Sequence, residues 1–411
     1  MSYAPPCTGL ECQIEHNCSG GTKTTLTGKV YAPNGTLPLY NATVFVPNAP
    51  LEAFTAGVSC DRCDGSVSGN PVAIALTDAT GSFTLTDVPG LMPGAPSAVE
   101  IPLVVQIGRW RRQVMIPAPT NCTTTAITSV DSTRLPRTKL EGDLPQMAIA
   151  SGGSDPFECL LRKVGIADSE FTTSAKDGRV HYYLQNGIDL QGGAPAASTL
   201  WTSPTTLMKY DIVILPCEGG SKTRDAGPLA NLVNYTNAGG RVFTTHYSHD
   251  WLHYSGSPFE AVGKWNDADA YPSDPLMGTL DTSFPKGMAF ADWLQNVMAT
   301  TTKGVMSIAQ PRHDIDSVTM KAQRWISWAS GILHMTFNTP INAQPDDMGI
   351  PQYCGRVVYS DFHVSASAAD FSQKFPASCK AGDMSGQEKA LAFMLFDLSS
   401  CVQKDSEQPI P

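Results

Sequence analysis

The spacing of apolar residues changes near residue 147, and this change restricts the fold more than any other feature. Before it, short runs such as 25–31 and 42–46 show partial two-residue alternation between turn residues, which predicts β-strands. After it, strand-like runs alternate with helix-like segments, a pattern typical of parallel sheets covered by helices. A chain of 411 residues also exceeds the usual size of one hydrophobic core. We therefore predict a multidomain protein, an all-β sandwich followed by an α/β doubly wound domain.

The most specific segment of the first part is Thr77 to Pro89, with the sequence TDATGSFTLTDVP. Gly81 closes an Asp-x-x-Gly turn in which a positive φ favours glycine, and Phe83 and Leu85 then share one face of a strand. This segment resembles the carboxypeptidase-regulatory-like family of transthyretin-like β-sandwiches, which occur as modules in exported proteins. The resemblance implies a spacer or docking module without catalytic residues.

Composition and turn residues divide the chain into five expected parts. The segment 128–146 carries two prolines and no hydrophobic period, so we expect it to be a linker. The Pro-, Ser- and Asp-rich stretch 255–285 is expected to be a long loop, and runs at 331–337 and 356–359 to be a hairpin or edge pair. The expected parts are a Cys-rich N-terminal arm (1–23), the β-sandwich (24–127), the linker (128–146), the α/β domain (147–403) and a tail (404–411).

Three segments of the α/β part carry a second resemblance. They are KYDIVILP at 209–216, AGGRVF at 238–243 and GRVVYS at 355–360, in that order. In this order they resemble the class I glutamine-amidotransferase-like superfamily, nearest to its trehalose-utilisation-like branch. The resemblance implies a flavodoxin-like sheet and, in catalytic members, a cysteine nucleophile on the turn after the strand at 241–245. Here that turn holds His246 and Tyr247, so the resemblance implies a domain without its nucleophile.

The predicted parallel strands end in glycines and polar residues. Ligands of open α/β sheets bind at the carboxyl ends of the strands, where glycines allow close backbone approach. Helix N-termini that follow such strands favour an anion, so a carboxylate or sugar acid is the expected ligand. The ligand-binding candidates are Gly152, Gly153, Gly219, Tyr247 and Asp361.

The same strand ends hold four candidate catalytic residues: Cys217, Glu218, His246 and His363. In a hydrolase, either histidine would act as the base, Glu218 as the acid or orienting group, and a metal-bound water as the nucleophile. No nucleophile-elbow motif accompanies them.

Three of the eight histidines fall in one window, at His246, His249 and His253. Their spacing places them on one face if a helix begins there, and Asp250 is adjacent. Imidazole and carboxylate together suit a divalent metal, the only cofactor that the sequence indicates. The alternative is a polar rim above packed aromatic residues.

Eleven cysteines, six of them before residue 123, indicate an exported protein with disulfides. A zinc knuckle is disfavoured because Cys60 and Cys63 lack a second pair at zinc-site spacing. The odd total leaves one thiol free or paired between chains. We prefer a Cys159–Cys217 disulfide to a reactive thiolate at Cys217. The first ten residues form no signal peptide, so export implies a processed or recombinant start.

Charge and hydropathy exclude two classes of function. The net charge of −10 without a basic block excludes a nucleic-acid partner, and no apolar stretch is long enough for a transmembrane segment. Three functions remain: a secreted, periplasmic or cell-surface binding protein without enzymatic activity, which we favour; a hydrolase; and a structural surface or filament subunit. Expected partners are other envelope or extracellular components, or a second copy of the chain.

Overall fold

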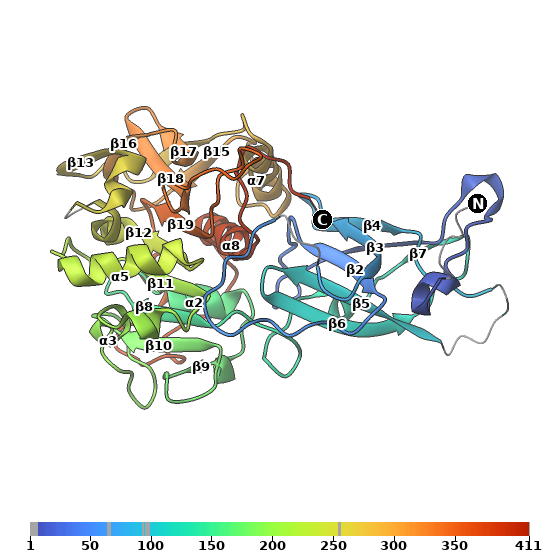
Figure 1. The fold of residues 1–411 in the computed structure, drawn as a ribbon. Helices are drawn as coiled ribbons and strands as arrows, with labels where there is room; N and C mark the ends of the chain where they lie inside the picture. Colours follow the sequence, from blue (N-terminus) through green and yellow to red (C-terminus); the bar gives the residue numbers. More distant parts are fainter. Residues whose placement is uncertain (1–6, 64–66, 93, 95–98, 254–255, 411) are drawn as a thin grey trace. The chain divides into compact units, whose positions relative to one another are not determined.

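The computed structural model describes residues 7–63, 67–92, 94, 99–253 and 256–410, and the chain divides into two compact units (Figure 1). The first unit comprises Met1–Phe54, Asp64–Asp143 and Pro409–Pro411, and the second comprises Thr55–Cys63 and Leu144–Gln408. Residues 128–143, expected as a linker, thus group with the first unit. The short segment 55–63 belongs to the second unit, although the sequence around it belongs to the first.

The first unit is built from two β-sheets. One has the order β4-β1-β7 and the other β3-β2-β5-β6. The turn before β4 has Gly81 at φ +75°, and the predicted alternation is confirmed because Phe83 and Leu85 are both buried. The strands are β1 (Thr25–Lys29), β2 (Thr43–Pro47), β3 (Pro71–Leu76), β4 (Ser82–Thr86), β5 (Glu100–Ile107), β6 (Trp110–Pro117) and β7 (Thr124–Ala126), with a short helix α1 (Val130–Thr133).

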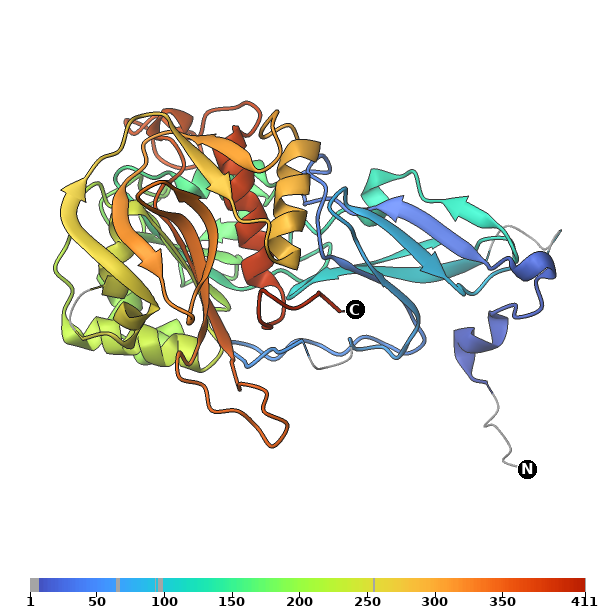
Figure 2. The same ribbon diagram turned by 90° about the horizontal axis from the view of Figure 1, so that it is seen from above.

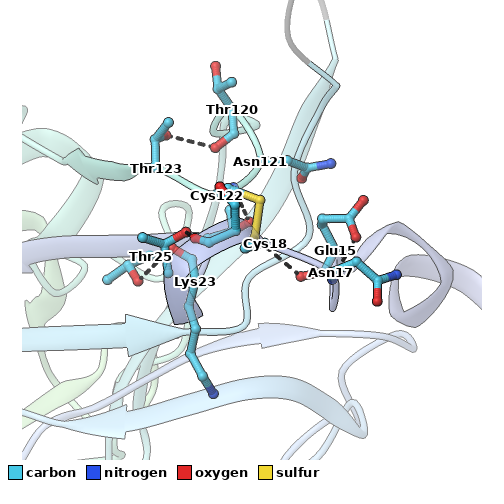
Figure 3. The surroundings of a disulfide bond; sticks show 12 residues. Glu15, Asn17, Cys18, Lys23, Thr25, Thr120, Asn121, Cys122 and Thr123 are labelled. Carbon is cyan, nitrogen blue, oxygen red and sulfur yellow. Dashed lines mark hydrogen bonds between the residues drawn. A yellow bond between two sulfur atoms is a disulfide. The ribbon is translucent and has the colours of Figure 1, made fainter.

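Ten of the eleven cysteines form disulfides. Figure 3 shows Cys18–Cys122, which joins the N-terminal arm to the segment leading into β7. The predicted Cys159–Cys217 pair is wrong, because Cys159 bonds to Cys379 and Cys217 stays a buried free thiol. That prediction assumed only that the strands before Cys159 and Cys217 are neighbours. Neighbouring strands do not determine the direction in which the following helix, α2 (Phe157–Lys163), points Cys159. The other pairs are Cys7–Cys12, Cys60–Cys354 and Cys63–Cys401.

The second unit contains a ten-stranded sheet whose parallel part has the order β9-β10-β8-β11-β12-β19. Counting the five main parallel strands along the chain gives the order 2-1-3-4-5, which is the flavodoxin-like arrangement. The predicted doubly wound fold is therefore confirmed. These strands are β8 (Met147–Ser151), β9 (Phe171–Thr172), β10 (Val180–Leu184), β11 (Ile212–Leu215), β12 (Arg241–Thr245) and β19 (Gly355–Ser360).

Four antiparallel strands extend the sheet beyond β19. Strands β18 and β19 pair as predicted, but β17 covers the other side of β18, so the pair does not form an edge. The predicted long loop at 255–285 is wrong, because it contains two strands: one has a polar sequence, and the other is only five residues long and follows a Pro- and Ser-rich stretch. The added strands are β14 (Leu276–Leu280), β15 (Val305–Ile308), β17 (Gln323–Trp328) and β18 (Gly331–Thr339), and a separate pair joins β13 (Gly263–Ala270) to β16 (His313–Val318).

Helices cover both faces of the parallel strands, as Figures 1 and 2 show. Leu229 and Leu232 of α5 pack in one core with Val213 and Val242, and Phe157 of α2 packs on Phe243 from the other face. The helices are α2 (Phe157–Lys163), α3 (Ser198–Trp201), α4 (Pro204–Leu207), α5 (Ala226–Asn237), α6 (Asp250–His253), α7 (Pro285–Asn296) and α8 (Gly386–Ser399). Among the described residues, no helix combines the length and apolarity that a membrane crossing requires.

Candidate functional site

The loops after β8, β11, β12 and β19 meet at the carboxyl edge of the parallel strands. The Ser154 amide donates to the Cys217 carbonyl oxygen (3.3 Å), which joins the first two loops. The Val364 amide donates to Asp155 Oδ1 (3.1 Å), which joins the loop after β8 to the loop after β19. In a doubly wound sheet this edge is where ligands bind.

Three potential metal ligands converge at this edge, and we call Cys217, His246 and His363 the strand-edge cluster. Cys217 Sγ lies 3.2 Å from His246 Nδ1, and the rings of His246 and His363 have centroids 4.6 Å apart. One ligand atom from each residue lies within 4.8 Å of the others. All three side chains are buried, with exposed fractions of 0%, 6% and 3%. The residues follow β11, β12 and β19, which are neighbouring parallel strands.

His246 adopts a left-handed backbone conformation, with φ of +52°. This region is costly for a residue other than glycine, so neighbouring contacts must hold it. The Tyr359 hydroxyl donates to the His246 carbonyl oxygen (3.2 Å), and the Ser248 hydroxyl donates to the Pro216 carbonyl oxygen (2.8 Å). These bonds fix the sharp turn after β12 and direct the imidazole toward the thiol.

Thr245 and Asp155 support the cluster from behind. The Cys217 amide donates to Thr245 Oγ1 (2.9 Å), and the Thr245 hydroxyl donates to Asp155. Burial raises the pKa of Asp155 to about 6, although the nearby His363 ring and these hydrogen bonds oppose the rise. Asp155 does not cap α2, because Pro156 occupies the N-cap and the Asp155 carboxylate turns into the site.

Burial also decides the protonation of the thiol and its partner. Burial raises the pKa of the Cys217 thiol to about 12. It also lowers the pKa of His246 well below its usual value, and His363 and Arg312 lower the His246 pKa further. In the metal-free protein at neutral pH, the pair is therefore a thiol beside a neutral imidazole, not a thiolate–imidazolium pair.

A charged network lies next to His246. Arg312 donates to Asp314 through Nε (2.8 Å), and the Tyr359 hydroxyl oxygen lies 3.1 Å from Asp314 Oδ2 and 2.9 Å from Asp361 Oδ1. Burial and the Asp314 charge raise the pKa of Asp361 well above its usual value. Burial opposes ionisation of Asp314, but His249 and Arg312 hold its pKa well below the usual range. One carboxyl group of the pair is thus neutral and the other is ionised.

Glu218, a predicted catalytic residue, and Tyr247, a predicted ligand-binding residue, each contact an arginine. Glu218 forms an ion pair with Arg224 and accepts a hydrogen bond from Gln185. The predicted catalytic acid is therefore held by a guanidinium. The guanidinium of Arg312 stacks over the ring of Tyr247, with Arg312 Cζ 3.9 Å from the ring centroid.

The four residues predicted as metal ligands make different contacts, and two of the four, His249 and Asp250, form an ion-pair contact with each other. His246 lies in the strand-edge cluster, and His249 lies between Asp250 (3.4 Å) and Asp314 (3.2 Å). His253 contacts Asp267 through Nε2 (2.7 Å). The cluster of potential metal ligands found among the described residues instead combines His246 with Cys217 and His363.

The predicted glycines let the loops pack against one another. A Cβ on Gly152 would lie 2.3 Å from the Cys217 carbonyl oxygen, and one on Gly153 would lie 2.6 Å from the Asn186 side chain. Gly219, at φ +83°, donates its amide to Cys217 Sγ (3.3 Å).

Sequence reasoning missed Thr245, Arg312 and Asp314 as members of the site. Thr245 carried a signal, since it is a buried hydroxyl at the end of an otherwise apolar strand. Arg312 and Asp314 carried none, because they precede and open β16, far along the chain from the other loops.

Comparisons with known proteins show limited likeness. No family model matches the sequence, and no curated protein matches it. The solved structures with a similar fold include a cytoplasmic protein from Salmonella typhimurium, which is 11% identical, with 62% of this chain and 99% of that chain covered and a TM-score of 0.34. They also include ThuA-like proteins from Bacteroides uniformis (9% identical, 61% and 90% covered, TM-score 0.32) and Parabacteroides merdae (10% identical, 63% and 91% covered, TM-score 0.33). Likeness at this level carries no information about function.

Proposed function

We propose that this is an exported or cell-envelope protein whose second unit binds a ligand at the strand edge and performs no cysteine-nucleophile chemistry. The first unit serves as a spacer or docking module for other envelope or extracellular components. Five disulfides support export, because such bonds persist in oxidising compartments and are rare in the cytosol.

The observation that carries the proposal is the identity and position of the residue on the turn after β12. His246 occupies this left-handed turn, where a superfamily nucleophile would be presented to substrate. The free thiol lies at the end of the neighbouring strand with no exposed surface. A nucleophile must reach a substrate carbonyl, so a fully buried thiol on the wrong strand supports binding over acyl transfer.

The hydrolase alternative is weaker for a specific reason. It assigns the acid or orienting role to Glu218, and that carboxylate is held by the buried guanidinium of Arg224. A carboxylate that already binds a guanidinium is not free to hold a substrate or a water molecule.

Hydrolysis and thiol labelling test the proposal together. The full chain and Cys217→Ala are assayed for hydrolysis of glutamine and of p-nitrophenyl acetate, and iodoacetamide labelling of Cys217 is followed by mass spectrometry. We expect no hydrolysis that depends on Cys217, and labelling of the native protein roughly 100-fold slower than in urea because the thiol is buried. Turnover that disappears in Cys217→Ala would overturn the proposal.

A further inference from the structure

The strand-edge cluster has the donor set of a transition-metal site. It offers one sulfur and two imidazole nitrogens, and one ligand atom from each residue lies within 4.8 Å of the others. A metal centred among them would need only small side-chain adjustments, because zinc–ligand bonds are roughly 2.0 to 2.3 Å long. Cys217 is also the single cysteine outside the disulfides.

We propose that Cys217, His246 and His363 bind one zinc ion. This inference rests on the proposed binding function and names the ligand of that same site. Thiolate and imidazole donors favour zinc and other borderline or soft metals, whereas magnesium and calcium require oxygen ligands. Binding forms a zinc–sulfur bond and two zinc–nitrogen bonds and releases the thiol proton to solvent, with no change in oxidation state.

The surroundings already orient the ligands. His363 Nδ1 lies 2.7 Å from the Val364 carbonyl oxygen, which can only accept, so Nδ1 carries the proton and Nε2 keeps its lone pair. Metal-bound histidines are characteristically held by such a bond from the second ring nitrogen to a carbonyl or carboxylate. The Gly219 amide points at Cys217 Sγ, where it would stabilise thiolate charge.

The backbone and nearby carboxylates complete the support. The turn that carries His246 is fixed by Tyr359, and the amide of Cys217 is held by Thr245. Asp155 and Asp314 lie close enough to act electrostatically on Cys217 and His246, respectively. These two carboxyl groups would offset the positive charge that zinc brings into a buried site. Three protein ligands also leave one coordination position, as in catalytic zinc sites.

A bare Cys–His hydrogen bond is the alternative account of the cluster. It explains the 3.2 Å approach of Cys217 and His246 but gives no role to His363, whose ring lies beside that of His246 with its proton already committed to a carbonyl. The two accounts predict different metal contents.

The test uses the untagged full chain with its disulfides intact. The protein is dialysed against EDTA, freed of chelator and titrated with zinc by calorimetry, and a parallel sample is titrated with cobalt(II) and followed by absorption. We expect one zinc per chain, proton release on binding, and a thiolate-to-cobalt charge-transfer band that zinc abolishes.

The variants Cys217→Ser and His363→Gln identify the ligands, with His16→Gln as the control because His16 is an exposed histidine of the first unit. We expect zinc affinity to fall roughly 100-fold or more in the first two and to stay unchanged in the control. The cobalt band of the unaltered protein reports sulfur ligation even if a variant fails to fold.

Two results would overturn the inference: less than stoichiometric zinc in the folded protein, or one zinc per chain with no thiolate band and undiminished affinity in both variants. If either result is found and no hydrolysis depends on Cys217, the zinc inference fails but the proposed binding function still stands. Cys217-dependent turnover of glutamine or ester instead overturns that function.

Discussion

Single residues in this protein take roles that depend on the direction of their side chains. Asp155 follows the pattern of a helix cap in sequence, yet its carboxylate accepts hydrogen bonds from Thr245 and from the Val364 amide. His246 lies in a backbone region that costs on the order of 1–3 kcal/mol for residues of its kind. The surrounding hydrogen bonds hold both residues in these arrangements, and the strand-edge cluster depends on them.

Glu158 of α2 provides a residue-scale prediction. Its side chain is fully buried, and burial raises its pKa to about 8 from an ordinary value of 4.5. Between pH 4.5 and about 8, Glu158 stays protonated in the folded protein but loses its proton in the unfolded chain. The contribution of this group to the free energy of unfolding is therefore complete below pH 4.5 and is lost as the pH rises toward about 8. The variant Glu158→Gln removes this titration.

We therefore expect Glu158→Gln to gain stability relative to the unaltered protein by about 1.4 kcal/mol per pH unit between pH 5 and 8. Urea unfolding at several pH values measures the difference. The control Glu407→Gln changes an exposed side chain and should show no such trend. A difference that stays constant with pH would contradict the prediction.

At the scale of elements, helix α8 illustrates how local and tertiary signals agree. Its first turn has a capping box, with the Ser385 hydroxyl accepting from the Glu388 amide (3.2 Å) and the Glu388 carboxylate accepting from the Ser385 amide (2.8 Å). Glu388 also pairs with Lys163 of α2 (2.7 Å). Asp397 near the other end of α8 binds Lys286 and Arg356, so both ends of the helix are fixed.

Removing the cap measures its share of the stability. Ser385→Ala should lower the free energy of unfolding by about 1 kcal/mol, because one helix amide loses its acceptor. Chemical denaturation gives this value, with Ser406→Ala as the control, since Ser406 is exposed and outside the helix. A loss of equal size in the control would show that the capping bond contributes nothing specific.

At the scale of the whole molecule, disulfides join segments that are distant in the chain. Cys60–Cys354 and Cys63–Cys401 span 294 and 338 residues and fasten the segment 55–63 within the second unit. Within the same unit, Cys159–Cys379 spans 220 residues. Bonds over such distances restrict the unfolded chain more than the short Cys7–Cys12 loop does.

The double variant Cys63→Ser, Cys401→Ser tests this effect without leaving a free thiol. We expect the free energy of unfolding of the second unit to fall by about 2–5 kcal/mol, seen as a lower midpoint in thermal unfolding. The matched double variant Cys7→Ser, Cys12→Ser should lower the free energy of unfolding of its own unit, the first, far less, because this disulfide joins residues only five apart in sequence. Equal losses in both variants would contradict the entropic account.

The sequence by itself determined the multidomain architecture and the doubly wound class of the second unit. The apolar run at β11 and the glycines after α5 indicate where strands begin and end, so they place Cys217 and His246 at strand ends. Strand and helix boundaries can be predicted from the sequence because hydrophobic periodicity and turn formation depend on residues that are close together in the chain.

Only the tertiary structure decided which distant side chains meet. It pairs Cys159 with Cys379 and leaves Cys217 free, it brings His363 to His246, and it inserts Asp314 from β16 beside the turn. Hydrophobic periodicity records which face of an element is buried but not which partner covers it. His363 lies more than a hundred residues along the chain from His246, so the sequence could place these residues at strand ends, but their contact follows from packing.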